Sequence, residues 1–590
     1  MSAATTGRDV QSLEFDYRRA PEQGAAEPAR HPVVVVGAGP VGLATAIDLA
    51  QRGRRVLLLD NDHKLSTGSR AICFAKRTLE IFDRLGCGDR MVAKGVSWNR
   101  GCVYFHADEI YRFDLLPDPG HECPAFINLQ QYHVEGSLVE RAQQLPAIEM
   151  RWLNKVVGVE PQGDHVRVEI ETPDGRYALE ADWLVACDGS RSSVRSLMGL
   201  ESKGRVFHDR FLIVDLTMDA PDFPSERRFW FDPPFHPGQS VLLHKQPDGM
   251  WRTDFQLGWD ADPEAERRPE RIVPRVRALL DSIGAEGVGF EIGWASVYTF
   301  ACQRMKRFRH GRVLFAGDSA HGVSPFGARG ANSGVQDADN LAWKLDAVLR
   351  GDAPDALLDT YASEREHAAD ENILASTRST DFISPKSPIS RLFRDAVLDL
   401  ARDHAFARRL VNSGRLSVPA TLDGSPLNTP DRDAFDGAMR PGAAAADAPV
   451  VETRPDGEHR DWLLRRLGAG FTLVVFGGDA WPDAFDAGLP LTRLLVAPDA
   501  AATAPPGVTV LRDDEACFAR RYDARPGSAW LLRPDQHVAA RWRQPRPGDV
   551  RNALARALAK AQDETTPTLA ALAAPRGGAS VAVGGRAPLT

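Results

Sequence analysis

Short apolar runs, glycine-rich turns and helical stretches follow one another in the first part of the chain. Pro32–Val36 is a proline followed by four valines, and Val56–Leu59 is a second uninterrupted apolar run. Such short runs are typical of strands that are buried on both faces. The stretch between them, Leu43–Gln51, has helical apolar spacing and stops near Gly53. The pattern therefore predicts a βαβ unit that opens a parallel sheet.

The same patterns predict further elements downstream. Arg77–Leu85 has the spacing of an amphipathic helix, and residues 166–180 alternate with period two around a Pro-Asp-Gly turn, which predicts a hairpin. Trp183–Ala186 and Val313–Ala316 are two more candidates for buried strands, and a long helix is expected over Ser333–Leu349.

Changes in composition divide the chain into regions. Residues 207–298 are rich in aromatic side chains and in alternation, which predicts a mostly antiparallel sheet inserted into the first domain. The expected regions are a flexible N-terminal arm (1–31), a core (32–375) with the sheet insertion at about 207–300, a helical connection and linker (376–455), a second α/β domain (456–575) and a disordered tail (576–590). The expected strands of the second α/β domain are Phe471–Phe476, Leu494–Ala497, Val508–Leu511, Trp530–Arg533 and His537–Arg543, with a closing helix over 549–561.

The overall composition is that of an ordinary globular protein. The 590 residues are 43% hydrophobic and 26% charged, and the net charge is -8. These values exclude collagen-like and wholly disordered classes and give no general attraction to nucleic acid or to anionic membranes. No apolar run approaches the ~18 residues that span a bilayer. We therefore expect neither a nucleic acid nor a membrane as a partner.

The seven cysteines are scattered along the chain, without a CxxC pair or the spacing of a metal site. Their odd number argues against a disulfide framework and for reduced thiols. We expect no metal ion, and we expect the protein to work in the cytoplasm.

A glycine-rich turn connects the first predicted strand to the first helix. In this GAGPVG segment, Gly37 permits the tight turn, Gly39 lets backbone amides approach a pyrophosphate, and Gly42 lets the helix pack closely on the strand. Asp60 ends the next strand, where its carboxylate is placed to bind a ribose. The helix N-terminus favours the negative charge of a pyrophosphate. The motif predicts a dinucleotide site and, taken alone, fits both NAD and FAD.

Two later regions resemble one enzyme family. Residues 187–195 (CDGSRSSVR) resemble the DG motif of the single-component flavin aromatic hydroxylases. Residues 312–321 (RVLFAGDSAH) resemble their GD motif, and residues 325–334 (PFGARGANSG) resemble the flavin loop that follows it. The order and separation of the motifs, over about residues 32–367, are similar to those of phenol hydroxylase and hydroxyphenylpropionate hydroxylase. The resemblance implies FAD as the bound cofactor and NADH or NADPH as the co-substrate.

The resemblance also implies roles for individual residues. Asp60 would bind the adenosine ribose, Arg70 would lie near the pyrophosphate or the flavin, and Asp318 would hold the ribityl chain. Family members usually carry glutamate at the position of Asp60. The aspartate here keeps the carboxylate acceptor, but its reach is shorter. The full set of expected cofactor-binding residues is Gly37, Gly39, Pro40, Val41, Gly42, Asp60, Arg70, Gln131, Asp188, Gly189, Asp318, Pro325, Gly327, Gly330, Ala331 and Asn332.

Three residues are the leading candidates for contact with the substrate, and each has a simpler alternative. Asp254 and Gln256, on strands of the inserted sheet, could also face the substrate, but each alone more often has a structural role. Tyr298 resembles tyrosines near the phenol in relatives and would help to relay its proton, but it also fits a half-buried strand. His244 lies on a strand of the inserted sheet, where a structural role is the alternative. Arg329 stands where the family more often has glutamine, and it would attract an acidic substrate or else point to solvent.

The C-terminal domain carries a second resemblance. Residues 527–535 (GSAWLLRPD) and 537–539 (HVA) resemble the thioredoxin-like domain that ends phenol hydroxylase-type enzymes. Without a CxxC pair this domain cannot exchange dithiols, so packing or support of a homodimer is its expected role. The expected fold class is α/β: a Rossmann-like FAD-binding domain with an inserted antiparallel substrate sheet and a thioredoxin-like C-terminal domain.

The family resemblance implies a monooxygenase that hydroxylates a small aromatic, phenolic substrate with NAD(P)H and O2 through a flavin hydroperoxide. Two alternatives remain open at the level of the sequence. One is another oxygen-dependent chemistry on the same scaffold, such as epoxidation or Baeyer–Villiger oxidation. The other is an FAD-dependent dehydrogenase that makes no use of oxygen.

Overall fold

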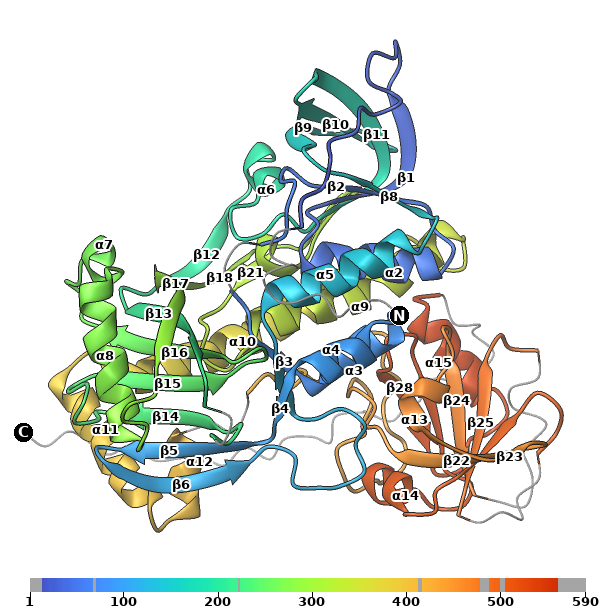
Figure 1. Cartoon of the computed structure of the whole chain (residues 1–590). Helices are drawn as coiled ribbons and strands as arrows, with labels where there is room; N and C mark the ends of the chain where they lie inside the picture. Colours follow the sequence, from blue (N-terminus) through green and yellow to red (C-terminus); the bar gives the residue numbers. More distant parts are fainter. Residues whose placement is uncertain are drawn as a thin grey trace, which may run out of the picture.

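The computed structural model describes residues 13–66, 70–220, 223–411, 416–477, 488–498 and 504–560. The predicted tail 576–590 and the first twelve residues of the predicted arm lie outside this part of the chain. Figure 1 shows three parts: a sheet-and-helix core, a second large sheet beside α8, and a C-terminal α/β unit (orange to red). Among the helices that the structure describes, none combines the length and apolar character needed to cross a bilayer.

The core is built on an eight-stranded sheet in which β1, β2, β8, β11 and β20 run parallel. The strands are β1 (Ala29–Val36), β2 (Val56–Leu59), β8 (Ile148–Arg151), β9 (Lys155–Pro161), β10 (Val166–Thr172), β11 (Gly175–Ala186), β19 (Arg309–His310) and β20 (Val313–Phe315). The valines of β1 and the leucines of β2 are buried, as expected of a sheet covered on both faces. The predicted βαβ unit and the hairpin β10–β11 are confirmed.

Helices of the core pack against this sheet and against one another. They are α2 (Pro40–Gln51), α3 (Lys76–Arg84), α4 (Gly88–Lys94), α5 (Gln131–Gln143), α6 (Ser193–Leu197), α9 (Gly330–Leu349) and α10 (Leu357–Ile383). Helix α2 lies between α5 and α9, and these helices share the largest hydrophobic cluster with β1, β2 and β11. Consequently the N-termini of α2 and α9, which follow two of the predicted motifs, belong to one layer.

The second large sheet has seven strands in the order β17-β13-β16-β15-β14-β5-β6. The strands are β5 (Arg100–Phe105), β6 (Asp108–Asp114), β13 (Arg210–Met218), β14 (Arg227–Phe231), β15 (Ser240–Lys245), β16 (Met250–Leu257) and β17 (Phe290–Tyr298). The predicted insertion at 207–300 accounts for five of them, whereas β5 and β6 come from an earlier part of the chain. β5 joins by parallel pairing with β14, so the sheet is only mostly antiparallel.

The outer face of this sheet is covered by α7 (Pro263–Glu266) and α8 (Pro269–Ser282). Leu212, Val214 and Leu216 of β13 pack against Ile272 and Val276 of α8. Because strand residues alternate between faces, the residues between those of β13 point the other way, toward the core domain. This second face is the one that matters for function.

Two small sheets and a helical segment complete the first part of the chain. The small sheets contain β3 (Cys73–Ala75), β7 (Phe126–Asn128) and β4 (Val96–Trp98), and β12 (Ser202–Val206), β18 (Ala301–Met305) and β21 (His321–Gly322). The helical connection predicted over part of 376–455 consists of the end of α10, α11 (Pro388–Ala401) and α12 (Ala405–Val411).

The C-terminal unit is a seven-stranded mixed sheet in the order β23-β22-β26-β25-β24-β27-β28. Its elements are β22 (Pro449–Arg454), β23 (Gly457–Trp462), α13 (Leu463–Arg466), β24 (Thr472–Phe476), β25 (Thr492–Ala497), β26 (Thr509–Arg512), α14 (Cys517–Tyr522), β27 (Ala529–Leu532), β28 (Val538–Trp542) and α15 (Asp549–Ala557). The five predicted strands are present. The sheet also recruits β22, which lies in the segment expected to be linker, and β23 beyond it.

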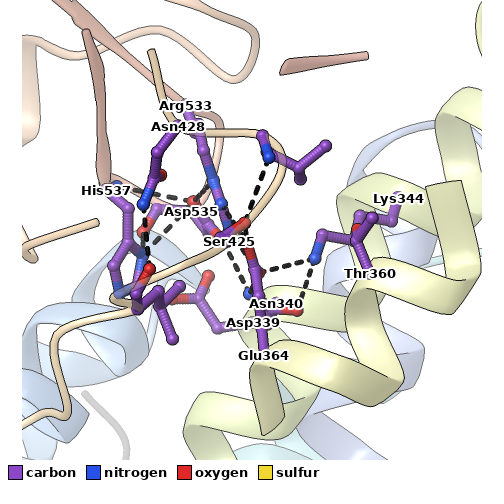
Figure 2. A network of polar contacts seen from close by, with 12 residues as sticks. Asp339, Asn340, Lys344, Thr360, Glu364, Ser425, Asn428, Arg533, Asp535 and His537 are labelled. Atoms are coloured by element: carbon purple, nitrogen blue, oxygen red, sulfur yellow. Dashed lines mark hydrogen bonds and ion pairs between the residues drawn. The ribbon is translucent and has the colours of Figure 1, made fainter. Parts of the chain in front are cut away.

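A buried network of charges joins the C-terminal unit to the core (Figure 2). The guanidinium of Arg533 donates to both carboxylate oxygens of Glu364 on α10, at 2.7 and 3.0 Å, and also to Asp535. Lys344 of α9 donates to the same Glu364 at 2.7 Å, and Asn340 donates to Glu364 and Asp535. The two parts of the chain are therefore held together by polar contacts from which water is excluded.

The part of the predicted N-terminal arm that the structure describes is packed on the core. Phe15 stacks on Trp152 with ring centroids 4.2 Å apart, and Glu22 forms an ion pair with Arg151 at 3.0 Å. The flexible arm predicted for 1–31 is thus attached from Phe15 onward, because its few large side chains find partners on the sheet.

Candidate functional site

The three predicted motifs meet at the carboxyl edge of the core sheet. A Cβ atom added to Gly37 would lie 2.5 Å from the carbonyl oxygen of Cys187, so the glycine loop touches the DG segment. Val41 fills the space beside Gly317 and Gly334, where added Cβ atoms would lie 2.9 and 2.7 Å from its side chain. Segments about 300 residues apart in the chain therefore form one site.

The glycine loop keeps open the space that a phosphate needs. Gly37 has a φ of +105° and Gly42 approaches the carbonyl oxygen of Gly37, so neither position accepts a side chain. A Cβ on Gly39, in contrast, would meet nothing within 4 Å. Gly39 directly precedes Pro40 at the start of α2, where the first backbone N–H groups of a helix have no partner within the helix.

Asp60 lies at the edge of this loop and binds it through hydrogen bonds to its carboxylate. One carboxylate oxygen accepts from the backbone N–H of Ala38 at 2.6 Å, and the other accepts from that of Asp62 at 2.8 Å. Burial raises the pKa of Asp60 above its usual value, and these hydrogen bonds oppose the rise. The residue thus stabilises the loop as well as standing where a ribose is expected.

The DG segment offers an unpaired acceptor to the same space. Asp188 accepts from the hydroxyl of Ser193 and the backbone N–H of Val194, both at 3.0 Å, and its second carboxylate oxygen is buried without a partner in the part of the chain described. Gly189 has a φ of +79° and open space around it. Buried acceptors are normally satisfied, so this atom indicates a missing ligand group.

The GD turn is held in place by a buried carboxylate on α9. Asp337 on α9 accepts from the backbone N–H of Gly317 at 2.9 Å, from His321 at 2.6 Å and from Arg365 at 2.6 Å. Burial raises the pKa of Asp337, but His321 and Arg365 outweigh that effect and hold it below its usual value. Asp318, one residue after Gly317, is exposed, whereas its neighbours Gly317 and Ser319 are buried.

The flavin loop begins at exposed Pro325 and leads into α9 through Gly327, Gly330 and Ala331. The side chain of Asn332 is fully engaged: it accepts from the backbone N–H of Ala75 at 2.8 Å and donates to the carbonyl of Cys73 at 2.9 Å. Asn332 thereby clamps the start of α9 to β3.

Arg329 does not point to solvent, which was one of the two sequence-based expectations. Its side chain is buried, and its guanidinium donates to the carbonyl of Phe326 at 3.1 Å and lies against Gly327. The cation is folded under the flavin loop, where it supports the loop from inside.

Gln131 lies at the start of α5, beside the segment that follows Arg70, and Arg70 lies near Tyr298. Gln131 accepts from the backbone N–H of Ala71 at 3.1 Å and donates to Glu135 at 2.7 Å, which positions the segment after Arg70. Desolvation raises the pKa of Tyr298, the negative charge of Asp318 adds to this effect, and Arg70 opposes it. Arg70, Asp318 and the half-exposed Tyr298 therefore lie near one another at the end of β17.

The inner face of the seven-stranded sheet closes the site from the other side. Arg252 of β16 makes a two-pronged ion pair with Asp215 of β13, at 2.7 and 2.8 Å, and donates to the carbonyl of Arg70 at 3.2 Å. His244 on the neighbouring strand is 3% exposed. Burial, together with the positive charges of Arg227 and Arg252, lowers the pKa of His244 well below its usual value, so the imidazole is neutral.

Cys73 connects the two sides. Its carbonyl receives the hydrogen bond from Asn332 at the start of α9, while its thiol feels the charges of Arg227, Arg252 and Asp254 on the sheet. Burial raises the pKa of this thiol to about 11, so it stays protonated. The polar face of the sheet thus lies directly across from the flavin loop.

The residues present fit FAD. The open space at Gly39, the orphaned oxygen of Asp188 and the exposed carboxylate of Asp318 provide for a pyrophosphate and for hydroxyl groups along one cleft. The isoalloxazine ring would then reach the start of α9, whose helix dipole favours the negative charge of a reduced flavin.

Several residues that build the site were not predicted from the sequence. Asp337 and Arg365 support the GD turn, and Arg227, Arg252 and Cys73 line the space below the sheet. The available signal was that polar residues occupy one face of this strand, as Arg252 and Asp254 do in MWRTDFQL.

Comparisons with known proteins agree with this geometry. The family described as an FAD binding domain matches residues 30–376. The probable NADH-specific resorcinol 4-hydroxylase of Rhodococcus jostii (strain RHA1) is 36% identical over 340 residues, which cover 57% of this chain and 62% of that protein, less than two thirds of its length. The 6-methylpretetramide 4-monooxygenase of Streptomyces rimosus is 32% identical over 532 residues, 86% of this chain and 90% of that protein.

A solved structure is similar over nearly the whole chain. The flavin-dependent monooxygenase PieE, in complex with FAD and substrate, superposes with a TM-score of 0.71 and 25% identity, covering 91% of this chain and 100% of that one. The prediction that the cofactor is FAD is confirmed by these matches. The chain belongs to the family of single-component, FAD-dependent aromatic hydroxylases.

Proposed function

We propose that this protein hydroxylates a phenolic ring, using NADH or NADPH and O2, in the chamber between the flavin loop and the inner face of the seven-stranded sheet. The observation that carries this proposal is the position of Cys73, which joins the start of α9 to a sheet face bearing His244 and Arg252. A similar protein is named as an NADH-specific resorcinol hydroxylase, which supports a phenol and a nicotinamide.

The chain's own residues would exclude water and orient the ring. Bound FAD supplies the oxygen-activating chemistry. Neutral His244 has a buried nitrogen without a partner among the described residues, and this nitrogen would hydrogen-bond a ring substituent. Tyr298 would help to relay a proton. Arg329 is better placed to hold the flavin loop than to touch the substrate.

Epoxidation and Baeyer–Villiger oxidation would use the same chamber. The similarity to a 6-methylpretetramide 4-monooxygenase keeps a substrate of that kind among the candidates. A hydroxylase is favoured because polar groups line the chamber. An apolar alkene would leave these groups unpaired, at a cost of about 1–3 kcal/mol each.

The test uses purified FAD-loaded protein and a panel of phenols. NAD(P)H loss, oxygen uptake, peroxide release and products are measured together. A phenol that stimulates oxygen uptake, releases little peroxide and yields a product with one added hydroxyl supports the proposal. Turnover that continues under nitrogen with a dye acceptor, without oxygen insertion, would identify a dehydrogenase instead.

We also propose a thioredoxin-like C-terminal unit and a homodimer. The strand order β25-β24-β27-β28, with β24 and β25 parallel, the others antiparallel and α15 last, supports the thioredoxin-like arrangement. Exposed apolar side chains on α11 support an interface between two copies: Ile389 is 80% exposed, Leu392 71% and Phe393 59%. The cysteines are all unpaired, which supports a reducing compartment such as the cytoplasm.

A further inference from the structure

The inner face of the seven-stranded sheet holds polar groups that have no partner in the described part of the chain. Asp254 on β16 makes no hydrogen bond or ion pair there, and its Oδ1 atom is buried. The Nδ1 atom of His244 is also buried and unpartnered. Arg227 on β14 makes no ion pair with any described residue, and its charge is felt by Cys73 and Asp254. Because orphaned buried polar groups are costly, their presence together indicates a site for a polar ligand.

Strand register places these groups on one surface. Leu242 lies opposite Asp254 and His244 lies opposite Arg252, so His244 and Asp254 are diagonal neighbours on the same face. Diagonal Cβ atoms in an antiparallel pair are about 7–8 Å apart or somewhat less. The two side chains are therefore spaced to contact two separate substituents of one ring rather than a single atom.

This surface faces the flavin loop. The Cys73 thiol, which feels the charges of Arg227 and Asp254, belongs to the residue whose carbonyl binds Asn332 at the start of α9. A ring held by Asp254 and His244 would consequently lie between the sheet and the place expected for the isoalloxazine.

The charges in the chamber select between ligand classes. Arg252 and Asp215 neutralise each other through their two hydrogen bonds. On this face of the sheet, among the described residues, one cation, Arg227, and one carboxylate, Asp254, remain, and His244 is neutral. A substrate carboxylate would place a second negative charge beside Asp254. A neutral phenol that passes its proton to Asp254 leaves the total charge unchanged.

We propose that the substrate is a neutral aromatic ring with two non-adjacent hydroxyl groups, and that Asp254 is the base that accepts the proton of one of them. The O–H bond of the phenol breaks, an O–H bond forms at Oδ1 of Asp254, and the electron pair stays on the phenolic oxygen. Arg227 stabilises the resulting phenolate, and Nδ1 of His244 binds the second hydroxyl. This inference rests on the proposed function and names its substrate class and its base.

The environment of Asp254 suits this role. Burial raises its pKa to about 6, against the opposing charges of Arg252 and Arg227 and with a contribution from Asp215. The other titratable groups that face it are His244, which is neutral, and the protonated thiol of Cys73. A carboxylate with this pKa is mostly ionised at neutral pH and is a better proton acceptor than an ordinary aspartate.

The experiment compares Asp254→Asn with the wild type, both loaded with FAD. Glu291→Gln is the matched control, because Glu291 is an exposed carboxylate on β17 of the same sheet. The probes are resorcinol, phenol and 3-hydroxybenzoate. Dissociation constants come from calorimetry, and ionisation of the bound phenol is read from its ultraviolet difference spectrum, which does not depend on turnover.

We expect bound resorcinol to ionise in the wild type and in Glu291→Gln but to stay protonated in Asp254→Asn at pH 7. Loss of the base should lower kcat/KM by about 100-fold at pH 7. The deficit should shrink toward pH 10, where phenols near their usual pKa of about 10 ionise without help. In Arg227→Gln the dissociation constant for resorcinol should rise by about tenfold, even if Asp254→Asn were to fold poorly.

Two results would overturn the inference. One is an Asp254→Asn variant with the ionisation spectrum and pH profile of the wild type. The other is a wild type that binds 3-hydroxybenzoate at least as tightly as resorcinol. Failure of the proposed function would look different, because the phenol would still bind and ionise while no hydroxylated product formed.

Discussion

Three glycines of the first loop face different neighbours, so substitutions separate their roles. An alanine at Gly42 would place its Cβ 1.8 Å from the carbonyl oxygen of Gly37, whereas one at Gly39 would meet no protein atom within 4 Å. Gly39→Ala should therefore unfold in urea like the wild type in the absence of FAD, yet bind FAD at least tenfold more weakly. Gly42→Ala should lose about 1–3 kcal/mol of stability through overpacking. Equal losses of stability in the two apoproteins would contradict this assignment.

Ionisation of Asp254 destabilises the folded protein by an amount that depends on pH. Because its pKa is raised from 3.8 to about 6, the folded protein holds this proton more tightly than the unfolded chain does. The penalty for ionising the group is absent below about pH 4, grows as pH rises toward 6 and is complete above that. Asp254→Asn should thus be more stable than the wild type at pH 7.5, by on the order of 3 kcal/mol, and close to it near pH 4. Urea unfolding at both values checks this, and a difference that does not change with pH would refute it.

The glycine loop and the acid after β2 were predictable because their requirements are local. A positive φ or a close backbone approach must be met by the residue itself, as at Gly37. Arg227 and Cys73 gave no such signal, and Asp254 was only one of several strand residues that could face the substrate. The surroundings of all three are made by segments that lie far apart in the sequence. The sequence therefore identified the cofactor more readily than the groups facing the substrate.

Among the elements, buried strands were predicted well and edge strands poorly. β1 and β2 consist of apolar residues throughout, whereas β23 reads GEHRDW and lies at the edge of its sheet, where charges are solvated. β5 (RGCVYF) has no clear alternation, and its parallel pairing with β14 depends on residues more than a hundred positions later. Pairing between segments that lie far apart in the chain produces no sequence pattern in either segment alone.

Helix α11 presents an apolar face that the described chain leaves exposed. Leu392→Glu, at a side chain that is 71% exposed, should convert the proposed dimer to a monomer without loss of folding stability. Leu197→Glu on α6, at 42% exposure, is the control for a charge placed elsewhere on the surface. Sedimentation velocity checks both variants. A wild type that is monomeric at high concentration, or a Leu392→Glu variant that remains dimeric, would exclude this interface.

At the scale of the whole molecule, the C-terminal unit is fixed to the helix that carries the flavin loop. Trp343 and Ala347 of α9 share a hydrophobic cluster with Leu473 and Ala540 of the C-terminal sheet. Beside that cluster, Lys344 and Glu364 meet Arg533 (Figure 2). The C-terminal unit therefore packs on the far half of α9, whose N-terminus faces the cofactor site.

Arg533 is the centre of this attachment, and its removal should be severe. In Arg533→Met, Glu364 and Asp535 would remain buried as negative charges with fewer partners, which costs about 3–5 kcal/mol. Arg533→Lys should recover only part of this loss, because an ammonium cannot serve two carboxylates with the planar fork of a guanidinium.

The double variant Arg533→Met/Glu364→Gln should lose less than the sum of the two single changes, since each removes the same contact. Arg440→Met, which breaks an exposed pair with Asp423, should change stability by about 0–1 kcal/mol. Urea unfolding of these five variants and of the wild type measures the differences. A loss below about 1 kcal/mol in Arg533→Met would show that the network does not hold the two parts together.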